Sequence, residues 1–392
     1  MKSACLLLVN ALFWLPLPLR DASADICEIS LTIHVTDQNQ NPIEGANIGL
    51  GSIAGQRASE LADEDRSGTE WYYYGNCRSD KHGHAVLKTE RRLLDHFCIV
   101  GRHEKRKIIA INHVSDPSSP LTMRLVPEHE VSLDITSREL AKRDHKLGNV
   151  RLTVFQVGKA SAVFDSLAQD ARLVLPAGHY ELDINAGWPA QRMKKVIEVL
   201  QTSDAQRLDT IDLLAARMFA LEGEQAPDLA DVVAWKNSVP LRLADLRGKC
   251  VILEFGGYWC GPCVRQLPIL FSLFDKYQAK GLVIIWVHSD VARDDYIPVG
   301  DASALDDRLA GIRASAWNGR DIPFPVAITM SKEAPTPIAG DLPGFATNAT
   351  YAAFGVHAVP DAVLIDRQGR VVKRFDPESD SDIAILRKTL GE

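Results

Sequence analysis

The chain has 392 residues, of which 46% are hydrophobic and 24% are charged, and its formal net charge at pH 7 is −7. This length favours two or three domains with sizeable cores. The negative charge gives no electrostatic basis for binding nucleic acid or anionic lipid, so we expect proteins as partners.

The first 24 residues have the features of a secretory signal. Lys2 precedes an apolar run over residues 4–19, and Ala22-Ser23-Ala24 offers a cleavage site between small residues. We therefore expect export to the periplasm or cell envelope, with no stable membrane insertion after cleavage. The alternative is an uncleaved signal that tethers the protein to the membrane, but the apolar run is short for a span.

Residues 25–126 alternate apolar and polar residues in the manner of short strands, which we expect at 29–35, 46–50, 84–87, 97–100, 108–111 and 121–125. The order of Val35-Thr36-Asp37, the stretch 42–48 and Gly83 is similar to carboxypeptidase regulatory-like domains. This resemblance implies a β-sandwich without catalytic groups. A polar insert over 51–76 departs from the family's pattern.

Residues 127–200 are expected to form a second small β-sandwich-like domain, with strands at 131–135, 150–157, 171–175, 180–184 and 196–200. A linker over 201–214 should follow, and a helical piece should cover 211–221.

From residue 215 to 392 the pattern changes, because predicted strands now alternate with predicted helices. We expect strands at 251–255, 282–288 and 326–328, a hairpin of 362–365 with 371–375, and helices at 260–279, 303–317 and 381–390. This order predicts an α/β fold with a mixed sheet. The whole chain is thus predicted to be multidomain, with β-sandwich domains before a C-terminal α/β domain.

The motif Trp259-Cys260-Gly261-Pro262-Cys263 follows the first of these strands directly. A C-x-x-C motif at the start of a helix is typical of a redox dithiol, because the helix N-terminus stabilises a thiolate. We expect Cys260 at the N-cap to be the nucleophile and Cys263, one turn further on, to be more buried. The alternative is half of a zinc site, but no second cysteine pair follows. We expect no metal and no cofactor.

The remaining cysteines of the mature chain are expected to have structural roles. Export would place them in a compartment that permits disulfides. A structural disulfide between Cys77 and Cys98 is expected, because the two flank a predicted hairpin, although connectivity cannot be derived from sequence. Cys250 lies in an apolar strand and is expected to be inert.

The residues around the dithiol resemble the thioredoxin superfamily, and their order looks like its TlpA-like, redoxin branch. Glu254 stands six residues before Cys260, Pro268 five after Cys263, and Val359-Pro360 precede an apolar strand. The resemblance implies a thioredoxin-like fold over 215–392 and thiol–disulfide oxidoreductase activity. It also implies a buried acid at Glu254 and a cis-proline at Pro360. We expect Trp259 to shield the dithiol and the Val359 backbone beside Pro360 to pair with an extended substrate segment, so these three residues are the predicted substrate-binding residues.

These features together predict an exported enzyme that reduces protein disulfides through Cys260 and Cys263, with Glu254 exchanging a proton with Cys263. Its partners would be disulfide-containing proteins and a membrane or periplasmic electron donor. One alternative is a peroxiredoxin-like thiol peroxidase, although Gly257 stands where those enzymes carry threonine. Another is a non-catalytic surface scaffold with a thioredoxin fold.

Overall fold

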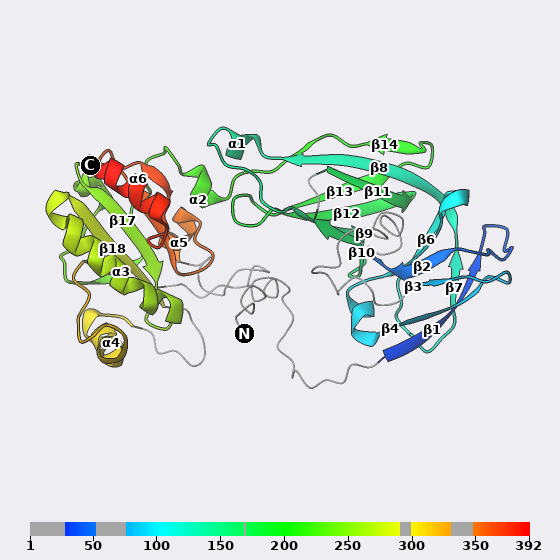
Figure 1. The fold of residues 1–392 in the computed structure, drawn as a ribbon, viewed down its shortest axis with the longest axis horizontal. Helices are drawn as coiled ribbons and strands as arrows, with labels where there is room; N and C mark the ends of the chain where they lie inside the picture. Colours follow the sequence, from blue (N-terminus) through cyan, green and yellow to red (C-terminus); the bar gives the residue numbers. More distant parts are fainter. Residues whose placement is uncertain (1–27, 52–75, 168–169, 291–298, 331–347) are drawn as a thin grey trace, which may run out of the picture. The chain divides into compact units, whose positions relative to one another are not determined.

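The computed structural model describes residues 28–51, 76–167, 170–290, 299–330 and 348–392. The chain divides into two compact units, Met1–Leu214 and Ala215–Glu392. The predicted signal, residues 1–24, lies outside the described residues. In the described ranges no helix is long and apolar enough to cross a membrane. The N-terminal unit consists mainly of strands, whereas the C-terminal unit combines strands and helices (Figure 1).

The described part of the N-terminal unit contains three sheets. Their strand orders are β4-β1-β7, β10-β9-β12-β13 and β11-β8-β6-β5-β2-β3, and β14 and β15 pair with β8. The bounds of the strands and of one short helix are β1 Glu28–Thr36, β2 Asn47–Leu50, β3 Asn76–Arg78, β4 His84–Glu90, β5 Ile99–His103, β6 Ile108–Asn112, β7 Leu121–Arg124, β8 Val126–Thr136, α1 Arg138–Ala141, β9 Arg151–Gln156, β10 Ala162–Leu167, β11 Asp170–Pro176, β12 Gly178–Asn185, β13 Met193–Val199, β14 Ala205–Arg207 and β15 Ile211–Asp212.

Alternating burial explains why these segments form strands. In β1 the side chains of Leu31, Ile33 and Val35 are buried, and the residues between them are more exposed. These three belong to one buried cluster with side chains from β2 and β5, which are part of another sheet. The β-rich character predicted for this region is therefore confirmed, and its assignment to the carboxypeptidase regulatory-like family stays a prediction.

The predicted linker at 201–214 is wrong, because this segment is hydrogen-bonded into the N-terminal unit. β14 and β15 run parallel to β8, with Ala205 opposite Glu130 and Ile211 opposite Ile135. Ile211 and Leu213 are buried here without forming a helix, and of the predicted helical piece at 211–221 only Arg217–Ala220 (α2) is helical. β8 also pairs with β6 and β11, so one sheet joins the two N-terminal regions expected as separate domains.

The predicted disulfide between Cys77 and Cys98 is also wrong, since both cysteines are free. Cys77 lies on β3, and Cys98 directly precedes β5. β2 lies between these two strands, pairing with β3 on one edge and with β5 on the other. Strands that flank a third are about 9.5 Å apart, which exceeds the Cα separation of roughly 7 Å that a disulfide can bridge.

The C-terminal unit is built on a six-stranded mixed sheet with the order β16-β19-β18-β17-β20-β21. β17, β18 and β19 are parallel, and β20 and β21 form the predicted antiparallel hairpin. β16 and α5 were not predicted. The elements after α2 are β16 Val232–Lys236, β17 Cys250–Gly256, α3 Gly261–Tyr277, β18 Leu282–Asp290, α4 Ala302–Ala316, β19 Val326–Met330, α5 Ala349–Phe354, β20 Asp361–Ile365, β21 Val371–Arg374 and α6 Asp380–Leu390.

Helices cover both faces of this sheet. One buried cluster joins the sheet to α3, α4 and α6, and a second joins it to α2 and α5 (Figure 1). Every residue of β17 is buried, and its side chains alternate between the clusters. Cys250 and Ile252 face α3, whereas Leu253 and Phe255 face α5. By this alternation Glu254 faces α3.

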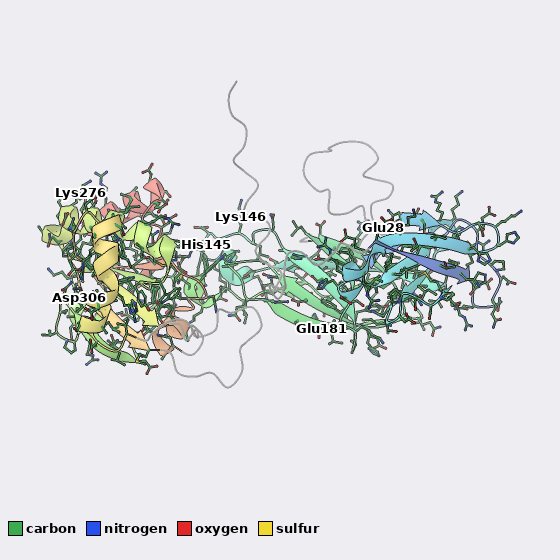
Figure 2. All side chains as sticks on the ribbon, turned by 90° about the horizontal axis from the view of Figure 1, so that it is seen from below. Glu28, His145, Lys146, Glu181, Lys276 and Asp306 are labelled. Atoms are coloured by element: carbon green, nitrogen blue, oxygen red, sulfur yellow. A yellow bond between two sulfur atoms is a disulfide. The ribbon has the colours of Figure 1, made fainter. Side chains whose placement is uncertain are left out.

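β16 is held at the edge of the sheet by a buried cation. The Nζ of Lys236 donates hydrogen bonds of 2.7 Å to Asp306 and to Asp321. Asp306 lies on α4, as Figure 2 shows. The two carboxylates compensate the charge of an ammonium group that would otherwise be costly to bury.

Candidate active site

The dithiol motif lies where β17 ends and α3 begins. Cys260 and Cys263 form a disulfide with an S–S distance of 2.07 Å and a Cα separation of 5.2 Å. Cys260 is the N-cap of α3, as predicted, and its Sγ accepts a hydrogen bond of 3.2 Å from the backbone N–H of Cys263. A thiolate at this position would interact with the unpaired N–H groups and the positive end of the helix dipole.

The two sulfur-bearing residues differ in exposure. Cys260 is 6% exposed and Cys263 is 1% exposed, which is the order that the sequence predicts. Cys260 is therefore the cysteine that a substrate can reach more easily, and Cys263 lies against the end of β17.

Trp259 is fixed beside the dithiol. Its Nε1 donates a hydrogen bond of 3.0 Å to the backbone oxygen of Ser289. Its ring packs over Gly257, where a Cβ atom would lie only 2.4 Å from Nε1. Glycine at position 257 thus allows the indole to lie flat against the chain just before Cys260.

Glu254 is buried in β17 at 2% exposure. Among the described residues neither of its carboxylate oxygens has a hydrogen-bond partner. Burial raises the pKa of Glu254 well above its ordinary value, and the carboxyl groups of Asp361 and Asp376 raise it further. Glu254 lies two residues before Gly256 on the same face of β17, about 6.8 Å along the strand.

Gly256 is the point of contact between β17 and Cys263. A Cβ atom at Gly256 would lie 3.2 Å from the Sγ of Cys263 and 2.9 Å from the Nε1 of Trp286. These contacts place the Cys263 sulfur over the end of β17, on the face of the strand that also carries Glu254. The buried acid and the buried cysteine therefore share one face of the sheet.

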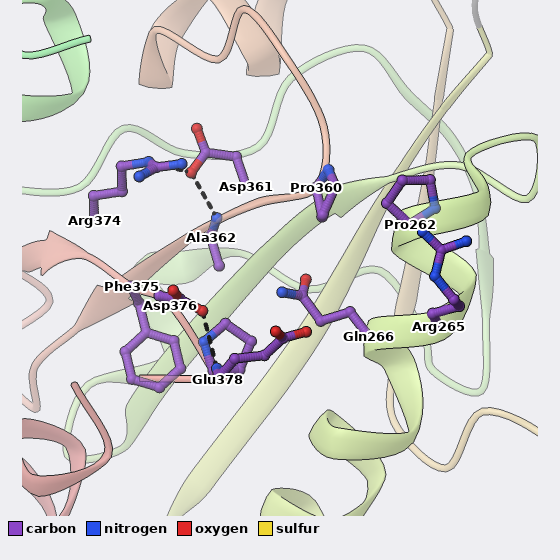
Figure 3. Close-up of a pocket in the computed structure, with 11 residues that line it drawn as sticks. Pro262, Arg265, Gln266, Pro360, Asp361, Ala362, Arg374, Phe375, Asp376 and Glu378 are labelled. Atoms are coloured by element: carbon purple, nitrogen blue, oxygen red, sulfur yellow. Dashed lines mark hydrogen bonds and ion pairs between the residues drawn. The ribbon is translucent and has the colours of Figure 1, made fainter. Parts of the chain in front are cut away.

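The bond between Val359 and Pro360 is cis, as the resemblance implied. Pro360 and Pro262 of α3 both line one cavity of about 420 Å³. Figure 3 shows this cavity between the start of α3 and the β20–β21 hairpin. The segment with the cis-proline thus borders the same space as the dithiol helix. The remaining lining residues are mostly polar: Arg265, Gln266, Asp361, Ala362, Arg374, Phe375, Asp376, Pro377 and Glu378.

Asp361 and Arg374 form an ion pair in the wall of this cavity that was not predicted from the sequence. The Nε of Arg374 donates to Oδ1 of Asp361 at 2.7 Å (Figure 3), and the Asp361 side chain is 1% exposed. Burial raises the pKa of Asp361 to about 6, although Arg374 opposes the shift. An acid directly after the cis-proline was the available signal, since Pro360-Asp361 opens an otherwise apolar strand.

Trp286 and His288 on β18 are further buried polar side chains that were not predicted. Both are 0% exposed, and their rings meet edge to face at 5.2 Å. His288 also stacks on Tyr258 at 5.7 Å, and burial lowers its pKa to about 3. His288 is opposite Gly256 in the register, so these rings lie beside the Cys263 sulfur.

Comparison with known proteins agrees with this geometry. The sequence model of the family named Redoxin matches residues 221–390. Thiol-disulfide oxidoreductase ResA of a Bacillus cereus strain is 30% identical over 156 residues, which cover 39% of this chain and 68% of the relative. The chain belongs to the redoxin family of thiol-disulfide oxidoreductases.

Two further proteins are similar to this redoxin. ResA of Bacillus anthracis is 28% identical over 156 residues, covering 39% of this chain and 68% of that protein. The crystal structure of a thiol-disulfide isomerase from Corynebacterium glutamicum is 26% identical, with a TM-score of 0.31, and the match covers 43% of this chain and 97% of that one. By its family, the C-terminal unit has a thioredoxin-like fold, and the protein is an oxidoreductase.

Proposed function

We propose that this redoxin is an exported reductase of protein disulfides. The observation that carries the proposal is the Cys260–Cys263 disulfide at the N-terminus of α3, beside a cavity bordered by the cis-proline. Gly261 and Pro262 between the cysteines also resemble the reducing members of the thioredoxin superfamily.

In the proposed reaction the Cys260 thiolate attacks one sulfur of a substrate disulfide. An S–S bond forms between Cys260 and the substrate, and the other substrate sulfur leaves as a thiolate that takes up a proton. Cys263 then attacks Cys260, which restores the enzyme's disulfide and releases the second substrate thiolate. The substrate gains two electrons and the dithiol loses two, so a dithiol donor must reduce the enzyme again.

Glu254 is proposed to take the proton that Cys263 loses in the second step, directly or through water. Burial raises its pKa, so its carboxylate form binds a proton more tightly than a surface carboxylate would. Its position on the face of β17 that also contacts Cys263 supports this role.

The substrate is proposed to lie against Trp259, Val359 and Pro360. An extended segment could pair with the backbone at Val359, in the manner of an added strand. The charged wall formed by Arg265, Arg374 and Glu378 borders the same cavity and would contact residues that flank the substrate disulfide.

Export and the partners belong to the proposal as well. The signal-like residues 1–24 support transport to the periplasm or cell envelope, where an electron donor at the membrane would reduce the enzyme. The N-terminal β unit, with its similarity to carboxypeptidase regulatory-like domains, is proposed to position the enzyme or its partners.

Trapping with Cys263→Ser tests this function. Without Cys263 the mixed disulfide cannot be resolved, so the variant should accumulate covalent adducts through Cys260 that a reductant releases and that mass spectrometry identifies. Cys260→Ser is the matched control and should give none. Reduction of peroxide by the wild type without any trapped protein would instead favour the peroxidase alternative.

A further inference from the structure

Trp286 carries a buried hydrogen-bond donor that the fold leaves unused. Its side chain is 0% exposed, and its Nε1 has no acceptor among the described residues. A buried N–H group without a partner is costly, and few such groups occur in native structures. Other indoles in the same unit are paired: Trp259 donates to Ser289 and Trp317 donates to Val264.

The position of Trp286 indicates which group it serves. It lies on β18, opposite Glu254 of β17, and packs in the cluster beneath α3. Its Nε1 and the Sγ of Cys263 lie 2.9 and 3.2 Å from one point, the position that a Cβ atom of Gly256 would occupy. The indole nitrogen and the sulfur are therefore no more than about 6 Å apart.

The redox state decides whether the donor has an acceptor. In the disulfide, the Cys263 sulfur is neutral and bonded to Cys260. When the disulfide opens, this sulfur becomes a thiol that must ionise before it can attack again. A thiolate is a strong acceptor, and a hydrogen bond to a charged group is worth more than one between neutral groups.

We propose that the Nε1–H of Trp286 donates a hydrogen bond to the Cys263 thiolate and so promotes the resolving step. The inference rests on the proposed function, in which Cys263 releases the substrate. In that step the proton of the Cys263 thiol goes to Glu254. The electron pair of the Cys263 sulfur forms the S–S bond to Cys260, and the bond from Cys260 to the substrate breaks. His288, edge to face with Trp286 at 5.2 Å, restricts the orientation of the indole.

Glycine at 256 is what makes this arrangement possible. Any side chain there would occupy the space between the indole nitrogen and the sulfur.

The other ionisable groups on the elements around Cys263 stay unchanged when Trp286 is replaced. They are Glu254 on β17, His288 on β18, Asp361 on β20, Arg265 on α3 and Arg308 on α4, which lies over the Tyr258 ring.

The test is the titration of Cys263 in full-length Cys260→Ser protein, with and without Trp286→Phe. Alkylation of Cys263 by iodoacetamide is followed by mass spectrometry across pH. Loss of one charge-assisted hydrogen bond should lower the thiolate fraction roughly tenfold, which raises the midpoint of the titration by about one pH unit. In the Cys260-containing protein, the same substitution should slow release of the mixed disulfide by a similar factor.

Trp317→Phe is the matched control. It removes an indole of the same core whose Nε1 donates to the backbone oxygen of Val264 on α3 at 2.9 Å. If Trp286→Phe acts only by loosening α3, Trp317→Phe should shift the midpoint equally. That result, or an unchanged midpoint in Trp286→Phe, would overturn the inference.

Two measurements keep the test decisive. If Trp286→Phe does not fold, the protein with Trp286 in place is labelled with ¹⁵N-tryptophan and reduced. One protected indole N–H signal should then titrate together with Cys263, and the absence of such a signal contradicts the inference. Trapping by Cys263→Ser is run in parallel. If adducts form but Trp286→Phe does not shift the midpoint of the Cys263 titration, only this inference is rejected. If no adducts form at all, the proposed function is rejected.

Discussion

Cys98 in the N-terminal unit and Cys263 in the C-terminal unit are almost equally buried, at 0% and 1% exposure. Cys98 is free, and burial raises its pKa to about 12. Cys263 is disulfide-bonded to a cysteine at a helix N-terminus and lies over a strand that carries a buried acid. The backbone around a cysteine, more than its depth, therefore decides whether it can act in redox chemistry.

Removal of one thiol from each unit should have the largest effect in the C-terminal unit. Cys260→Ser should lower the reduction of insulin disulfides by about three orders of magnitude or more, because the nucleophile is lost. Cys98→Ala should leave the rate close to that of the wild type. Both are measured by the turbidity of released insulin chains with dithiothreitol as the donor. A large loss of rate in Cys98→Ala would show that the N-terminal thiol takes part.

Gly256→Ala tests whether the close packing beneath Cys263 matters. The new methyl group would lie within 3.2 Å of the Cys263 sulfur and 2.9 Å of Trp286 Nε1. We expect the free energy of unfolding to fall by about 1–3 kcal/mol, as for other overpacked cores. Urea denaturation of the oxidised protein measures it.

Gly311→Ala on α4 is the control for this substitution, since a Cβ at Gly311 meets nothing within 4 Å. It should stabilise the protein by about 0.5–1 kcal/mol, because alanine is the better helix former. Equal behaviour of the two alanine variants would mean that Gly256 is not tightly packed.

Glu254→Gln tests the buried acid through pH. An acid whose pKa rises on folding holds its proton more tightly in the folded state, so the free energy of unfolding falls as pH rises from 4.5 toward the raised pKa. Glutamine removes this loss. The variant should therefore gain stability over the wild type with increasing pH, by about 1.4 kcal/mol for each unit between the two pKa values.

Urea denaturation of the oxidised proteins at pH 4, 6 and 8 measures the difference between Glu254→Gln and the wild type. Glu378→Gln, which makes the same chemical change at an exposed carboxyl, is measured beside it as the control. Parallel pH profiles of Glu254→Gln and the wild type would contradict the raised pKa.

The smallest effect is expected from removing the N-terminal unit. Residues 215–392 form a compact unit that contains the dithiol, Glu254 and the cis-proline. The pH midpoint for alkylation of Cys260 should therefore be the same in this fragment and in the full chain. A shifted midpoint would show that the β unit contributes to the chemistry.

Elements whose signals are local could be predicted from the sequence. C-x-x-C after an apolar strand predicted both the position of Cys260 at the N-cap and the deeper burial of Cys263. The apolar pattern predicted a helix at 260–279, and α3 covers Gly261–Tyr277 with Leu267, Leu270 and Phe271 buried at helical spacing. These predictions hold because capping and periodicity depend on residues within a few positions of one another.

Features that depend on contacts between distant segments could not be predicted from the sequence. The expected Cys77–Cys98 bridge failed because β2 lies between the two cysteines, and the expected linker became β14 and β15 because β8 offered them an edge. In the same way Trp286 and Arg374 meet the dithiol region from strands far along the chain. Sheet register brings such residues together, and no local pattern records it.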